Sequence, residues 1–337
     1  MARLQLRKYV FIGILCVIVL IIVLNLSRAA DLFSVAIRIA PGWLLIAIGL
    51  QAMTYLFAAN IYRAIIRLLG YTAKLSRLYL ACITVFFLNQ TVPSGGVSGN
   101  AFLFKLLERM KMPQGKKVLV VVLDLMIYYT AFVVLVLFGL FYLIIHKELD
   151  KAYLAPLFLA FGLLLGVSYL FLHLAHKKSR LQKFIVFLAS HLSRIRKKRL
   201  KLARLLFFVD DLFEGKQIVK QHIRRFIMPL FFQFCIFFLS ALTIAALFRG
   251  FGYKAHLTIV IAGLAISLLL SMVSFIPGGL GVFEASMAFV YANLGVPTIY
   301  ALIVTLLYRV ISFWLPLPFG LLIYRKYEEE LKPNTNK

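Results

Sequence analysis

The stretch SFIPGGLGVFE, residues 274–284, interrupts a long apolar tract with one proline, three glycines and a carboxylate. Proline removes a backbone donor and glycine adds backbone freedom, so neither favours a helix interior. In the hydrocarbon of a bilayer, backbone groups freed in this way are tolerated only where they are buried in protein or line a wet cavity. A weaker version of the pattern is NQTVPSGGVSGN, residues 89–100. We therefore predict two broken helical pairs, which the rest of the chain holds at depth in a membrane.

The remaining sequence has the composition of a membrane protein with several spans. Of its 337 residues, 63% are hydrophobic, and the mean hydropathy is +0.94, well above that of a soluble domain. Six apolar runs are long enough to cross a bilayer core of about 30 Å, and two shorter runs lead into the breaks. The long runs are 9–27, 42–62, 118–145, 152–174, 226–248 and 298–324, and the short runs are 78–92 and 257–276. The predicted fold class is an all-α polytopic integral membrane protein with about eight hydrophobic segments.

The net charge of +26 comes from basic residues whose distribution indicates the membrane topology. Of the 38 Lys and Arg residues, 15 lie in the segment 176–225. Loops rich in Lys and Arg are cytoplasmic under the positive-inside rule and attract anionic lipid headgroups, so we do not predict nucleic-acid binding. The three cysteines stand singly in apolar runs and the six histidines show no ligand spacing. We therefore predict no disulfide framework, no metal site and no cofactor.

Counting these charges decides between two topologies. If each break joins two half-helices that enter and leave on one side, six full spans and two re-entrant pairs place 31 basic residues in the cytoplasm and six outside. If both short runs are simple crossings, the better orientation places 22 inside and 15 outside. The first division fits the positive-inside rule better, so we predict re-entrant pairs, with both termini cytoplasmic.

The two breaks also belong to an internal repeat. Pro93 and Pro277 are 184 residues apart, and Gln51 and Gln233 are 182 apart, so a two-residue slip reconciles the offsets. Each copy reads as a span, a broken pair and a span, and the counted topology makes the repeat inverted, a recurrent transporter plan. The expected single membrane domain consists of a first helix 10–27, repeat 1 at 44–145, a connecting span 152–174, a basic cytoplasmic segment 176–225, repeat 2 at 226–324 and a cytoplasmic tail 325–337.

The breaks are where we expect a ligand. Half-helix N-termini bind anions, and glycine lets a ligand approach the backbone closely; alternatively, the glycines only permit tight helix crossing. The intramembrane charges are Asp124, Glu284 and Arg309, each costly in an apolar setting. Our first hypothesis pairs Asp124 with Arg309 across the repeats, and the alternative partner of Arg309 is Glu284 or a lipid phosphate. The candidate binding residues are Pro93, Ser94, Gly95, Gly96, Asn100, Pro277, Gly278, Gly279, Gly281, Glu284, Arg309 and Asp124.

Three motifs carry a resemblance to a known family: NxxxPSGGxxG at 89–99, PGGLGxxE at 277–284 and LYRxxSFWxP at 307–316. Over about residues 10–325, the chain resembles the flippase-like membrane domain of lysylphosphatidylglycerol synthases, a group that overlaps the UPF0104 family. The resemblance implies movement of an anionic or aminoacylated phospholipid between the leaflets of a prokaryotic inner membrane. Stand-alone relatives are also expected to move lipid-linked sugars or polyprenyl phosphates.

Other functions stay open beside lipid flipping. Full-length relatives carry a soluble synthase domain, whereas this sequence ends at Lys337, so we do not expect aminoacyl transfer. One alternative is a membrane lipid transferase with Glu284 or Asp124 as base. The other is a scaffold for a separate lipid synthase or glycosyltransferase. No ATP-binding motif is present, so any driving force is expected to come from gradients or mass action. A membrane phospholipid is the expected partner, and a homo-oligomer or a partner synthase is left open.

Overall fold

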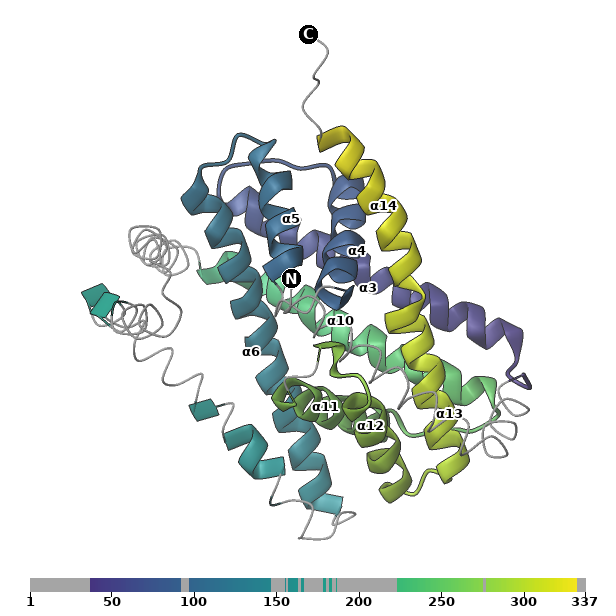
Figure 1. The fold of residues 1–337 in the computed structure, drawn as a ribbon. Coiled ribbons are helices and arrows are strands. Elements are labelled where there is room, and N and C mark those ends of the chain that lie inside the picture. Colours follow the sequence, from purple (N-terminus) through teal and green to yellow (C-terminus); the bar gives the residue numbers. More distant parts are fainter. Residues whose placement is uncertain are drawn as a thin grey trace, which may run out of the picture.

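A computed structural model describes residues 37–91, 97–146, 223–274 and 277–331, with short helical pieces between 155 and 186. These residues form helices joined by short turns, and no strand occurs among them (Figure 1). The all-α prediction is therefore confirmed.

Several predicted segments lie outside this part of the chain. They are the first helix 10–27, most of the connecting span 152–174, most of the basic segment 176–225, and residues 92–96 of the first break.

The described helices follow one order twice. The first set is α3 (Pro41–Leu68), α4 (Leu75–Thr91), α5 (Val97–Glu108) and α6 (Gln114–His146), with 28, 17, 12 and 33 residues. The second set begins with α10 (Ile223–Gly250), α11 (Leu257–Val273) and α12 (Val282–Asn293), again with 28, 17 and 12 residues. In place of α6 it has α13 (Thr298–Arg309), the π-helical turn η2 (Val310–Trp314) and α14 (Pro316–Leu331). The predicted order of a span, a broken pair and a span is thus found in both halves.

The two halves are inverted relative to each other, because the equivalent helices α3 and α10 pack side by side and run antiparallel (Figure 1). Where α3 begins and α10 ends, the N–H of Ala40 donates to the carbonyl of Gly250 at 2.9 Å. Further along, the rings of Phe57 and Phe232 lie 5.7 Å apart. Equivalent helices that run in opposite directions require the repeats to have opposite orientations.

The first broken pair, α4 and α5, enters and leaves at one end of the bundle. Lys116 at the start of α6 donates from Nζ to the carbonyl of Leu69 at 3.3 Å, and its ammonium lies 5.2 Å from the centre of the Tyr71 ring. The turn that precedes α4 therefore lies beside the start of α6, as a re-entrant pair requires.

The second broken pair, α11 and α12, does the same at the other end. The Tyr253 hydroxyl, which follows α10, donates to the carbonyl of Gly295, and the Tyr253 ring stacks on Tyr300 at 5.6 Å. Since α3 and α10 are antiparallel, the ends at which the two pairs enter are opposite ends of the bundle.

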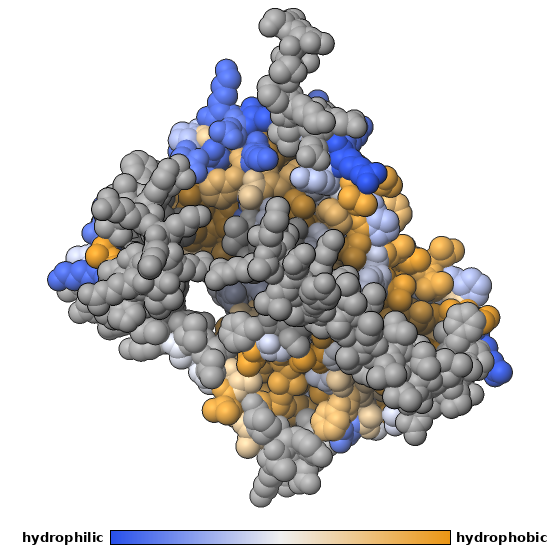
Figure 2. All heavy atoms as spheres, viewed as in Figure 1, coloured by the Kyte–Doolittle hydropathy of each residue, from blue (hydrophilic) through white to orange (hydrophobic). Residues whose placement is uncertain are grey.

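The described helices also have the lengths and surfaces of membrane spans. Four of them are long and apolar enough to cross a bilayer: 41–68, 114–145, 224–250 and 298–327. Figure 2 shows hydrophilic side chains gathered at the end where α5 and α14 lie, with hydrophobic side chains over much of the surface below. The number of membrane crossings in the whole chain stays a prediction.

The inverted repeat predicts the sidedness of two equivalent turns. Thr72 and Lys254 are both exposed and occupy matching positions after α3 and α10. In a background with the three native cysteines replaced by serine, we expect Thr72→Cys and Lys254→Cys to react with a membrane-impermeant maleimide from opposite sides. Labelling of intact and of permeabilised cells measures this. Labelling of both positions from the same side would contradict the inversion.

Candidate functional site

The second break has a backbone that only glycine adopts easily. Gly278, Gly279 and Gly281 have φ values of +66°, +61° and +83°, in the left-handed region that strains residues with a Cβ. Gly278 and Gly279 belong to the short helical turn η1 (Pro277–Gly279), and Gly281 immediately precedes α12. The glycines predicted from the sequence are therefore required by the turn itself.

The glycines also bring the break into contact with both halves of the protein. A Cβ on Gly278 would lie 2.6 Å from the Phe313 ring in η2 and 2.7 Å from Oε1 of Gln90 in the last turn of α4. A Cβ on Gly279 would overlap the hydroxyl of Ser271 in α11. The second break therefore lies against the end of α4, the first helix of the first broken pair.

Glu284 caps the helix that follows the break. It is the third residue of α12, and its Oε2 accepts a hydrogen bond from the N–H of Gly281 at 2.7 Å. The first N–H groups of a helix have no partner within the helix, and a carboxylate there also suits the positive end of the helix dipole. This contact explains the acid at this position without any ligand.

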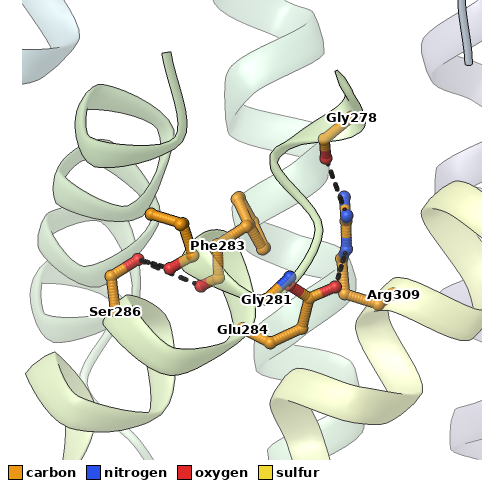
Figure 3. A network of polar contacts seen from close by, with 7 residues as sticks. Gly278, Gly281, Phe283, Glu284, Ser286 and Arg309 are labelled. Carbon is orange, nitrogen blue, oxygen red and sulfur yellow. Dashed lines mark hydrogen bonds and ion pairs between the residues drawn. The ribbon is translucent and has the colours of Figure 1, made fainter. Parts of the chain in front are cut away.

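Arg309 joins the two sides of the break (Figure 3). Its Nε donates to Oε1 of Glu284 at 2.6 Å, and its Nη2 donates to the carbonyl of Gly278 at 2.8 Å. The rings of Phe283 and Phe313 lie 4.9 and 4.5 Å from its Cζ, in the range of cation–π attraction. The side chains of Arg309 and Glu284 are only 10% and 19% exposed, so the ion pair is largely shielded from solvent.

One edge of the Arg309 guanidinium stays available. Arginine has five N–H donors, and only Nε and Nη2 make hydrogen bonds with the described residues. Nη1 therefore keeps its two donors for a further acceptor, in a side chain that is 10% exposed. The arrangement can thus accept an anion at Nη1 without breaking the ion pair.

The chain distorts directly after Arg309. The N–H of Leu315 donates to the carbonyl of Val310 at 2.7 Å, which is the i to i−5 spacing of a π-helix. Pro316 follows and has no N–H for the regular ladder. Single π-turns inside helices occur frequently at functional sites, and this one places Phe313 against both Arg309 and Gly278.

The first hypothesis for the charged residues, an Asp124–Arg309 pair, is wrong. Oδ2 of Asp124 instead accepts a hydrogen bond from the hydroxyl of Tyr62 at 3.0 Å, and Arg309 takes the alternative partner Glu284. Asp124 and Arg309 follow Pro93 and Pro277 at similar distances in the sequence, which predicted a similar depth in the membrane for both. It could not show that Asp124 points toward α3, whereas Arg309 points toward α12.

The half-helix after the first break, α5, is capped in a different way from α12. Oδ1 of Asn89 accepts a hydrogen bond from the N–H of Gly99 at 2.9 Å, so a side chain of α4 caps the start of α5. Asn100 of α5 is half-buried, and its side chain makes no hydrogen bond with the described residues. The other candidate residues of this break, Pro93, Ser94, Gly95 and Gly96, lie outside the described part of the chain.

Sequence reasoning missed three contributors to these sites. It included Asn89 in the motif at residues 89–99 without giving it a role, although its place before a glycine-rich turn was a usable signal for a cap. Phe283 and Phe313 were not singled out as contacts of Arg309. Phe313 follows Arg309 by four residues, a spacing that puts side chains on one helical face, so this contact had a signal too.

Comparison with known proteins gives consistent matches. The family model described as the lysylphosphatidylglycerol synthase TM region matches residues 10–320. A UPF0104 membrane protein of Methanocaldococcus jannaschii is 21% identical over the whole length of both chains. A UPF0104 membrane protein of Methanothermobacter thermautotrophicus is 31% identical over 28% of each chain.

The shielded ion pair predicts a strong energetic coupling. Arg309→Met would leave the Glu284 carboxylate without a cation and should cost about 3 kcal/mol, the lower end for broken buried pairs because Glu284 is partly exposed. Glu284→Gln should also destabilise, because the amide has one oxygen for the two donors, Gly281 N–H and Arg309 Nε, and Arg309 loses its anion. Reversible unfolding in mixed micelles of the single and double variants should give a coupling of about 1–3 kcal/mol. Additive losses would show that the pair does not stabilise the break.

Proposed function

Because the chain belongs to the family of the lysylphosphatidylglycerol synthase transmembrane region, we propose that it moves an anionic or aminoacylated phospholipid, or a related lipid, between leaflets. The single observation that carries this proposal is the Arg309 guanidinium, held at a break in membrane-spanning helices, whose Nη1 makes no hydrogen bond to the described residues. Arginine suits phosphate because its planar fork can donate two hydrogen bonds to one group.

The Glu284 carboxylate is already one anionic partner of Arg309, so a lipid phosphate would be the second. It already takes the hydrogen bonds of Arg309 Nε and of the Gly281 N–H. A headgroup phosphate that bound at Nη1 would share Arg309 with this carboxylate. The guanidinium would then stay paired before the lipid binds and after it leaves, which avoids the cost of an isolated charge in the membrane.

The backbone at the break leaves room for such a ligand. A Cβ placed on Gly281 would meet no atom within 4 Å, in contrast to Gly278 and Gly279. A headgroup could therefore approach the start of α12 closely while its tails stay in the bilayer. Helix N-termini provide N–H groups for phosphate binding.

The inverted repeat supplies a means of alternating access. The two broken pairs enter from opposite ends and touch where Gln90 meets Gly278. In inverted-repeat transporters, one bundle rocks against the other around a site at the midplane. Here such a movement would open the Arg309 site to one leaflet and then to the other.

We further propose that the protein resides in a prokaryotic cytoplasmic membrane with both termini in the cytoplasm. Support comes from the exposed basic residues at the end of the bundle where α3, α5 and α14 finish. These residues are Arg67, Lys74, Arg77, Lys105, Arg325 and Lys326. Basic residues gather on the cytoplasmic side under the positive-inside rule.

Reconstitution with labelled lipid tests the proposed function. Vesicles would contain phosphatidylglycerol with a fluorescent label on one acyl chain, and dithionite quenching would follow its exchange between leaflets. We expect the protein to accelerate exchange, and Arg309→Lys to slow it about 10- to 100-fold, because a charge-assisted hydrogen bond worth about 1.5–3 kcal/mol is lost. Arg325→Lys, at an exposed position of α14, is the matched control and should exchange as the wild type does.

A second lipid set decides whether the proposal fails. Lysylphosphatidylglycerol, phosphatidylcholine and a polyprenyl phosphate with equivalent labels would be compared in the same vesicles. If vesicles with and without protein exchange every one of these lipids at the same rate, the flipping function is wrong. Equal rates for Arg309→Lys and the wild type would remove Arg309 from the mechanism.

A further inference from the structure

Asp124 is an acid within a membrane-spanning helix that the Arg309 site does not use. It lies on α6, where it faces α3 and α4, and it accepts one hydrogen bond, from the Tyr62 hydroxyl at 3.0 Å. The neighbouring residues Leu123 and Ile127 are 1% and 5% exposed, whereas Asp124 is only half-buried. The carboxyl group therefore lies within the helix bundle, beside the Tyr62 hydroxyl.

No cation balances this carboxylate within the described residues. The ionisable groups around Asp124 are Tyr62 from α3, Cys82 from α4 and, one turn along α6, Tyr128. α5 and α10 add apolar side chains to the hydrophobic cluster around Leu123 and Ile127, among them Leu103 and Phe232. An ionised carboxylate without a cation is costly in such surroundings, so binding a proton is the direct way to neutralise it.

The position of Asp124 links it to the movement of the helices. It sits where α6 contacts α3, α3 packs against α4, and the far end of α4 touches the second break through Gln90 and Gly278. A change of charge on Asp124 would therefore act through α3 on the packing of α4, which contacts the Arg309 site. The two acids of the spans then have different roles, since Glu284 is neutralised by Arg309 and Asp124 has only a proton available.

We propose that Asp124 is a proton-binding site that couples lipid movement to a proton, with one proton crossing for each anionic headgroup. This inference rests on the proposed function and adds the coupling ion to it. The negative charge of the headgroup and the positive charge of the proton then cross together, so the cycle moves no net charge. The proton stays bound to the carboxyl oxygen during the crossing and is released to water on the other side.

The pH dependence of exchange tests this proposal with the labelled phosphatidylglycerol vesicles. Above the titration of Asp124, wild-type exchange should fall about tenfold per pH unit, as a one-proton equilibrium requires. Asp124→Asn, permanently neutral, should retain exchange but lose this dependence. Tyr62→Phe removes a donor that stabilises the ionised form, so its profile should move to higher pH. Glu108→Gln alters an exposed carboxylate, 72% exposed, and is the matched control with an unchanged profile.

A pH-sensitive dye inside the vesicles gives the second readout. Wild-type protein given labelled phosphatidylglycerol on the outside should acidify the interior as the lipid moves inward, and Asp124→Asn should not. Exchange by the wild type without proton movement, and with a flat pH profile, would overturn the coupling while leaving the flipping function intact. If wild-type vesicles show no exchange, the flipping function fails for this lipid, and the coupling fails with it. Elution of each variant as a single species in size-exclusion chromatography confirms that it is folded.

Discussion

The ion pair between Arg309 and Glu284 is the contact on which the second break depends. A break in a membrane helix exposes backbone groups that lipid cannot satisfy. Glu284 satisfies the N–H of Gly281 and Arg309 satisfies the carbonyl of Gly278, so one pair closes both sides of the turn. Each charge also removes the cost of burying the other. The glycines adopt left-handed backbone conformations without the strain that a Cβ would add, which permits this geometry. The π-turn after Arg309 brings Phe313 against the guanidinium.

The two repeats share a scaffold but not this chemistry. Their helices match in length and order, and α3 and α10 run antiparallel. At the start of the second half-helix, however, the first repeat uses the neutral cap Asn89 and the second uses the charged cap Glu284. Only the second therefore needs a cation. The symmetry provides two similar half-helix pairs, and the difference in capping places the charge at one of them.

The fold was predictable because its signals are long and repeated. Spans follow from hydropathy, and the re-entrant pairs follow from the placement of Lys and Arg. The offsets of 182 and 184 residues in the sequence match the starts of α10 and α13 relative to those of α3 and α6. The partner of Arg309 was not predictable in the same way. Pairing depends on the direction in which each helix turns its side chains, and a uniformly apolar helix carries little information about that direction.

A symmetric scaffold with one charged break favours a single anion site over two. If each break bound a phosphate, each would need its own cation, but the residue that corresponds to Arg309 on α6 is the apolar Leu125, which is exposed. The first repeat instead carries Asp124, an acid that has no cation beside it among the described residues. An anion drawn to Arg309 and an acid placed in the opposite repeat would repel each other unless the acid holds a proton. The distribution of charge between the repeats thus favours one headgroup site, at Arg309, whose occupation depends on the protonation of Asp124 in the other repeat.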